Sequence, residues 1–157
     1  MNHSQLLAKL NWFYNLELNQ VDLYTSLSKT FEDKYTSLVF QRLSYIEQQH
    51  VDNIAVKIKE MGGAPSTLGD ILSPIIGSIA GKVLSLAGTE NILKAAIKLE
   101  QKAIEDYRNL IQIVNKNGYD QELLKILEHN LIDEDLHTAW FIKTLSQIPK
   151  LRSHKLK

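Results

Sequence analysis

The chain has 157 residues, and its 18 Lys plus Arg balance its 18 Asp plus Glu, so the formal net charge is +0 at pH 7. This length suits one domain with a hydrophobic core, and the balanced charge argues against nucleic acid as a partner, because phosphate binding needs a basic excess. The sequence has no cysteine, which excludes disulfides, zinc–thiolate sites, iron–sulfur clusters and thiol nucleophiles. Any bound metal must therefore be held by His and carboxylates.

Four long helices are predicted from apolar residues that recur with a 3.6-residue period. Glycine and proline are concentrated between residues 62 and 88 and near the C-terminus, where they mark breaks between helices. Thr89 and Asp120 are expected to cap the third and fourth helices, and Pro149 is expected to end the fourth. The predicted helices cover residues 4–30, 35–61, 90–117 and 121–148.

The connections between these helices predict their topology. The short turns within the first pair and within the second pair make the helices of each pair antiparallel neighbours. The segment 62–88 is long enough to cross the bundle and has room for a short helix. We therefore expect an all-α fold, an antiparallel four-helix bundle with a long crossover between its second and third helices. Residues 1–148 are expected to form this bundle and residues 149–157 a C-terminal tail.

Two features of the chain bear on membranes and location. The first 20 residues have no basic stretch followed by an apolar run, so we expect no secretory signal and a cytoplasmic protein. The longest apolar stretch, 71–88, is interrupted by Pro74 and Lys82 and is a poor membrane span. It is expected either to pack as part of the crossover or to form an apolar lip that contacts an apolar substrate or a membrane surface.

A repeated pattern of acidic, imidazole and phenol side chains relates the two pairs of helices. The segments LELNQVDLY (16–24) and LEQKAIEDY (99–107) both contain Leu-Glu followed by Tyr seven residues after the Glu. The second and fourth helices each contain Glu-x-x-His. The chain therefore holds two copies of one two-helix unit, and pseudo-twofold packing would bring their inward polar side chains to one point in the core. These inward residues are Glu17, Tyr24, Glu47, His50, Glu100, Tyr107, Glu134 and His137.

The four Glu and two His of this pattern predict a metal centre. An unpaired carboxylate in an apolar core costs roughly several kcal/mol, and Lys and Arg fall mainly on the outer faces of the helices. Carboxylates with one imidazole per ion and no sulfur favour iron, or manganese, over structural zinc. The alternative is a bundle that buries hydrogen-bonded polar pairs and binds no metal. The predicted ligands of two metal ions are Glu17, Glu100, His50 and His137 as terminal ligands, with Glu47 and Glu134 as bridges.

One Glu on each of two helices and Glu-x-x-His on the other two resembles the pattern of the ferritin-like di-iron carboxylate superfamily. The resemblance covers residues 10–145 and fills all six ligand positions. Segment 81–111 is most similar to demethoxyubiquinone hydroxylases, which also place Tyr seven residues after a ligand Glu. Asp106 stands where that branch favours His, and the sequence lacks the cysteine-ligated domain of the rubrerythrin branch.

The resemblance implies a site at which two Fe(II) ions reduce O2 or peroxide. The main hypothesis is an oxidoreductase, similar to rubrerythrin or demethoxyubiquinone hydroxylase, that takes electrons from a separate donor protein. The alternative is a ferroxidase that binds or stores iron, and a third hypothesis is a structural bundle without metal. Tyr24 and Tyr107 are candidates for hydrogen bonding or radical transfer at the site, or are ordinary core residues. A homo-oligomer is expected.

Overall fold

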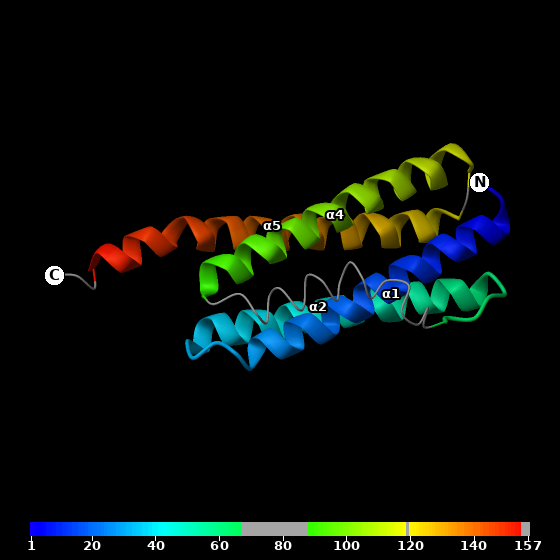
Figure 1. Ribbon diagram of the computed structural model, residues 1–157. Coiled ribbons are helices and arrows are strands. Elements are labelled where there is room, and N and C mark those ends of the chain that lie inside the picture. Colours follow the sequence, from blue (N-terminus) through cyan, green and yellow to red (C-terminus); the bar gives the residue numbers. More distant parts are fainter. Residues whose placement is uncertain (67–87, 119, 155–157) are drawn as a thin grey trace. The chain divides into compact units, whose positions relative to one another are not determined.

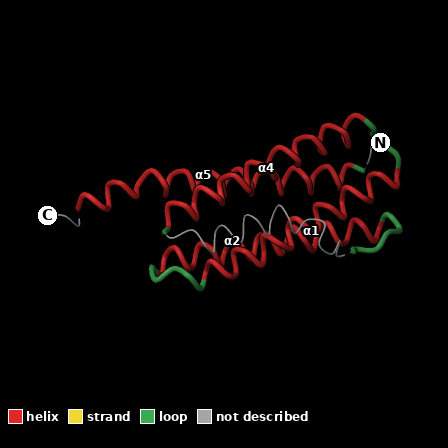
Figure 2. Tube along the Cα trace, viewed as in Figure 1, coloured by secondary structure: helices red, strands yellow, loops and turns green. Residues whose placement is uncertain are grey.

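The computed structural model describes residues 1–66, 88–118 and 120–154, with side chains described as far as residue 148. Within these residues the chain forms helices joined by loops, and Figure 2 shows no strand among them. The predicted all-α fold class is therefore confirmed for the described residues. Apart from Gly88, the apolar stretch 71–88 lies outside them, so neither of its two expected roles is tested. The helices are α1 (His3–Ser28), α2 (Lys34–Glu60), α4 (Thr89–Lys116) and α5 (Gln121–His154).

The chain divides into two compact units, Met1–Gly77 and Ser78–Lys157. In the first unit α1 packs against α2, and in the second α4 packs against α5 (Figure 1). Each unit is an antiparallel helical hairpin, as the short connections between its helices predict.

Side-chain caps fix both helix starts in the first unit. The Asn2 side chain accepts a hydrogen bond from the Gln5 backbone N–H, and the Gln5 side chain accepts one from the Asn2 backbone N–H, which is a complete capping box. Asp33 caps α2 by accepting a hydrogen bond from the Thr36 N–H at 2.8 Å. Gly62, with φ 76°, follows the end of α2, where a left-handed residue is needed to turn the chain.

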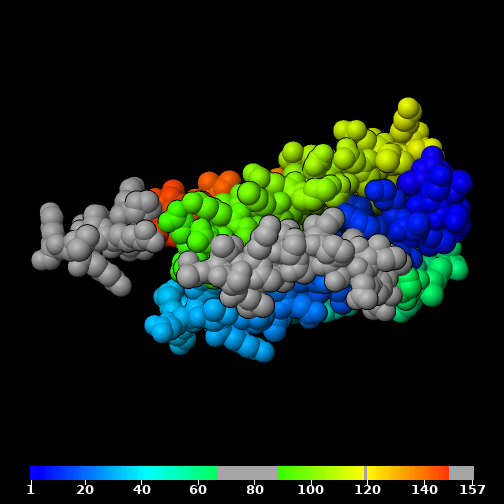
Figure 3. Space-filling model, viewed as in Figure 1, coloured from blue at the N-terminus to red at the C-terminus, as the bar shows by residue number. Residues whose placement is uncertain are grey.

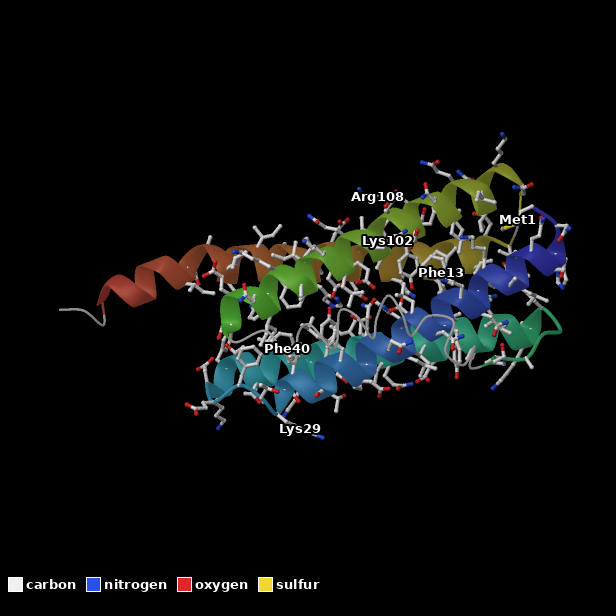
Figure 4. The ribbon with its side chains drawn as sticks, viewed as in Figure 1. Met1, Phe13, Lys29, Phe40, Lys102 and Arg108 are labelled. Atoms are coloured by element: carbon white, nitrogen blue, oxygen red, sulfur yellow. The ribbon has the colours of Figure 1, made fainter. Side chains whose placement is uncertain are left out.

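Aromatic rings pack the first unit near the turn between its helices. The Phe40 ring centroid is 5.1 Å from that of Phe31 and 5.8 Å from that of Tyr24. Phe13 and Phe40, both labelled in Figure 4, are buried, whereas Lys29 at the end of α1 points away from the hairpin.

At the opposite end of this unit, the N-terminal residues lie beside those that follow α2 (blue and green in Figure 3). There the His3 Nε2 atom is 3.0 Å from the Met61 carbonyl oxygen.

The second unit confirms one predicted helix start and corrects two other boundaries. Asp120 Oδ1 accepts a hydrogen bond from the Glu122 N–H at 2.9 Å, so this residue caps α5 as expected. Thr89 is the first residue of α4 and not its cap, because Gly88, with φ 107°, takes the cap position without a side-chain bond. The expectation that Pro149 ends the last helix is wrong, since α5 continues to His154. A proline removes one backbone N–H and strains the preceding turn, but a helix can continue past it.

None of the helices in the described part of the chain combines the length and the apolar character needed to cross a membrane. Whether residues 149–157 lie outside the domain stays a prediction.

The cap at Asp33 gives a testable pH dependence. Hydrogen bonds from the Thr36 side chain and from its backbone N–H hold the pKa of Asp33 below its ordinary value of 3.8. Because the folded state lowers this pKa, the stabilisation is present above about pH 4 and is lost as the pH falls through the folded-state value. We expect Asp33→Ala to lower the melting temperature at pH 7, and this difference from wild type to shrink near pH ~3.

Thermal unfolding of both proteins at the two pH values measures this effect. Asp22→Ala, at an exposed position inside α1, is the matched control and should change the melting temperature little at either pH. Equal differences between wild type and Asp33→Ala at both pH values would contradict the role of the Asp33 carboxylate.

Candidate metal centre

The first unit places a carboxylate of α1 beside an imidazole and a carboxylate of α2. Glu47 and His50 are three residues apart on α2, so their side chains are neighbours on one helix face. The His50 Nδ1 atom is 3.0 Å from Glu47 Oε2 and 3.7 Å from Glu17 Oε2. All three side chains are at most 2% exposed. The structure therefore brings together the three metal ligands predicted in this unit, which we call the α1–α2 half-site.

The second unit repeats this arrangement with the residues predicted from the repeat. Glu134 and His137 are three residues apart on α5, and Glu100 comes from α4. The His137 Nδ1 atom is 3.6 Å from Glu134 Oε2 and 3.7 Å from Glu100 Oε1. His137 is 4% exposed and both carboxylates are 0% exposed. These three residues form the α4–α5 half-site.

The chemistry of each half-site fits a metal ion. Each contributes two carboxylates and one imidazole, and the same ring nitrogen of each His lies within 4 Å of both carboxylates. Nitrogen and oxygen donors without sulfur are the ligands that iron and manganese bind in carboxylate sites. Two buried carboxylates carry more negative charge than one imidazole can balance, even when the ring is protonated. A cation among these donors would remove that imbalance.

The helices hold these polar groups between apolar neighbours. On α1, Glu17 lies one turn from Phe13 and two turns from Tyr24, and both rings are buried. On α2, Glu47 lies one turn from Leu43 and from Val51, which are also buried. The apolar surroundings limit access of bulk water and strengthen electrostatic interactions among these carboxylates and imidazoles.

Tyr24 and Tyr107 occupy repeat-related positions but have different neighbours. Both are 0% exposed. The Asn130 side chain donates a hydrogen bond to the Tyr107 hydroxyl oxygen at 3.0 Å, whereas the residue of α2 related to Asn130 by the repeat is Leu43. Tyr24 instead packs its ring on Phe40. The expected participation of the two tyrosines in hydrogen bonding or radical transfer at a metal stays a prediction.

Two buried amides, Asn130 and Gln20, were not expected from the sequence. Asn130 is 2% exposed and lies one turn before Glu134, and Gln20 is 0% exposed and lies one turn after Glu17. A polar residue one turn from a predicted ligand, on the same helix face, is the signal that could have identified both of them.

Asp106, which stands where the hydroxylase branch favours His, has a partner at the side of α4. Its carboxylate forms an ion pair with Lys102, one turn earlier on the same helix. Lys102 and Arg108 are both more than half exposed, and Figure 4 labels them on α4. Arg108 lies 3.4 Å from Asp135 of α5. Asp106 is therefore engaged in an ion pair at the surface of this unit.

Comparisons with known proteins agree with the helical architecture. A family model described as a ferritin-like domain matches residues 7–151. The chain is 23% identical over 151 residues to a bacterioferritin of Desulfovibrio desulfuricans, covering 94% of this chain and 78% of that protein. It is also similar to the X-ray structure of Desulfovibrio desulfuricans bacterioferritin, which is described as showing its diiron site in different catalytic states.

That structural match has a TM-score of 0.78 at 20% identity and covers 95% of this chain and 82% of the other. At this identity the likeness shows the fold alone. The predicted ferritin-like four-helix fold is therefore confirmed.

The hydrogen bond between Asn130 and Tyr107 can be tested with a double-mutant cycle. We expect Asn130→Leu and Tyr107→Phe to be coupled by about 1 kcal/mol in the free energy of unfolding, since each removes the same buried bond. Asn53→Leu, at an exposed position on α2, combined with Tyr107→Phe should be additive. Denaturant unfolding measures all of these variants. A coupling no larger than that of the control pair would show that the bond contributes nothing to stability.

Proposed function

Because the chain belongs to the ferritin-like domain family, whose model matches residues 7–151, we propose that it binds two iron ions and oxidises Fe(II) with O2 as a ferroxidase. The observation that carries this proposal is the duplicated half-site, in which a buried His nitrogen lies within 4 Å of two buried carboxylates. The diiron site named for the similar bacterioferritin supports the choice of iron, and manganese is the alternative.

We assign the six ligands as follows. Glu17 and His50 would be terminal ligands of one ion, and Glu100 and His137 terminal ligands of the other. Glu47 and Glu134 would bridge the two ions. The support for the terminal pairs is that each His is matched with the Glu of the neighbouring helix in its own unit, at the same 3.7 Å separation. The support for bridging is chemical, because two ions with one imidazole each need shared carboxylates to complete their coordination.

Bound iron would supply the electrons: two Fe(II) ions become Fe(III), and one O2 takes up two electrons and two protons to give hydrogen peroxide. The protein's own part is electrostatic. The four carboxylates stabilise the higher charge of the oxidised ions, and burial strengthens that stabilisation because the local dielectric constant is low. Carboxylates also shift between binding modes, so one ligand set can serve both oxidation states.

The comparisons favour the ferroxidase or storage alternative over the main hypothesis of a rubrerythrin-like or hydroxylase-like oxidoreductase, since the similar proteins are bacterioferritins. A separate electron-donor protein and the use of peroxide therefore remain secondary proposals. If the protein is an oxidoreductase of this kind, it should consume a quinone analogue or added peroxide when a reductant is present. A ferroxidase needs only Fe(II) and O2.

Storage would also require self-assembly, and we propose a homo-oligomer. The support is a stripe of large apolar side chains on the outer face of α2. Leu38, Tyr45 and Val56 are 51%, 54% and 52% exposed, and their spacing of 7 and 11 residues places them on one side of the helix. Exposed apolar side chains aligned in this way favour contact with another protein surface. A storage cage needs many copies, so the mass in solution separates storage from a small oligomer.

Iron titration tests the proposed site. Wild-type apo-protein should bind two equivalents of Fe(II) anaerobically and develop ferric absorption when O2 is admitted. Glu47→Ala and His137→Ala each remove one ligand and should weaken iron binding by at least about tenfold, since even residues that only orient ligands have effects of this size. Glu128→Ala and His129→Ala, at exposed positions on α5, are the matched controls and should bind as wild type does. Equal binding by all five proteins would refute the ligand assignment.

A further inference from the structure

The α1–α2 unit contains a buried amide that the proposed ligand set does not use. The Gln20 side chain is 0% exposed. Among the described residues, neither its Oε1 nor its Nε2 atom has a hydrogen-bond partner. An amide carries two donors and an acceptor, and burying it without partners is unfavourable, so such a group in a native protein calls for an explanation.

The position of Gln20 places it beside the α1–α2 half-site. It follows Glu17 by three residues and precedes Tyr24 by four, so these three side chains share one face of α1. Glu17 in turn lies 3.7 Å from the His50 Nδ1 atom. The amide is therefore one helical turn from a carboxylate that we assign to iron.

The repeat shows that the fold does not require a polar group at this position. The residue of α4 that follows Glu100 by three is Ala103, which is also 0% exposed. An apolar side chain therefore satisfies the packing in the second copy of the unit. The amide is a feature of the first copy alone, and it makes the two half-sites chemically different.

We propose that Gln20 is a ligand-recognition residue: its amide forms hydrogen bonds to a small anion, of the class that includes peroxide, held at the iron of the α1–α2 half-site. This inference rests on the proposed iron binding. A neutral amide suits such a ligand because it can donate to an anion and also accept from its protonated form. A carboxylate at this position would repel an anion, and the alanine of the other half-site cannot bond to one. The two iron positions then differ in their affinity for small anions.

Azide, a small linear anion, is the probe for the first test. It is titrated into iron-loaded, oxidised protein, and binding is followed by optical absorption and calorimetry. Gln20→Met keeps the length of the side chain and removes its hydrogen bonds, so we expect the azide Kd to rise about tenfold, which corresponds to about 1.4 kcal/mol. Gln41→Met, at an exposed position on α2, is the matched control and should leave the Kd unchanged. All three proteins should hold two iron ions.

The metal-free protein provides a second test that does not depend on bound iron. If Gln20 serves a ligand, Gln20→Met removes an unsatisfied buried amide and should raise the melting temperature of the apo-protein by about 2–4 °C. If the amide has a structural role, the same substitution lowers the melting temperature. Weaker azide binding together with a more stable apo-protein is the result expected of a recognition residue.

The outcomes separate the inference from the proposed function. Failure of the wild type to bind iron would overturn both. Two bound iron ions in Gln20→Met, with an azide Kd within twofold of wild type, would overturn the role of Gln20 and leave the ferroxidase proposal standing. A lower melting temperature of the Gln20→Met apo-protein would also overturn it, because it would assign the amide to packing.

Discussion

Buried negative charge is the constraint on which the rest of this structure depends. Each helical hairpin encloses two glutamates that are 0% exposed, with one histidine within 4 Å of both. Carboxylates are stable in such surroundings only where positive charge or hydrogen bonds compensate for the water they have lost. The long uninterrupted helices hold the Glu and His side chains in place, and buried apolar residues pack around them.

The geometry of a helix does much of the positioning. Glu47 and His50 on α2 are three residues apart, and so are Glu134 and His137 on α5. This spacing brings each carboxylate close to its imidazole without any contact from another helix. Only the third residue of each half-site, Glu17 or Glu100, must be brought in from the neighbouring helix. Apolar packing between the two helices of each unit brings this Glu to the His. The distance from the His Nδ1 atom to the Glu carboxylate is 3.7 Å in both units. Each hairpin therefore assembles its own cluster of two carboxylates and one imidazole from the same repeated pattern.

Much of this arrangement could be predicted from the sequence, because it follows from local rules. The period of the apolar residues placed every helix end within two residues except the C-terminal end of α5, and the positions of Glu and His on those faces predicted the residues that each half-site brings together. The errors arose where tertiary context decides. The helix continues through Pro149, and Gly88 takes the cap position expected for Thr89. Asn130 and Gln20 lie one turn from predicted ligands, but the packing between helices decides that their amides are buried. The Glu and His residues of the pattern are shared across the superfamily, which is why they could not separate a ferroxidase from related oxidoreductases.

The most direct test of a shared two-metal centre is anomalous diffraction at the iron edge from crystals of the protein loaded with Fe(II). Two iron peaks are expected about 3.5–4 Å apart, the range of bridged two-metal sites. One should be bound by His50 and the other by His137, with carboxylates shared between them. Absence of iron at these residues, or a single ion at either half-site with the other histidine unligated, would contradict the proposal that the two hairpins build one centre.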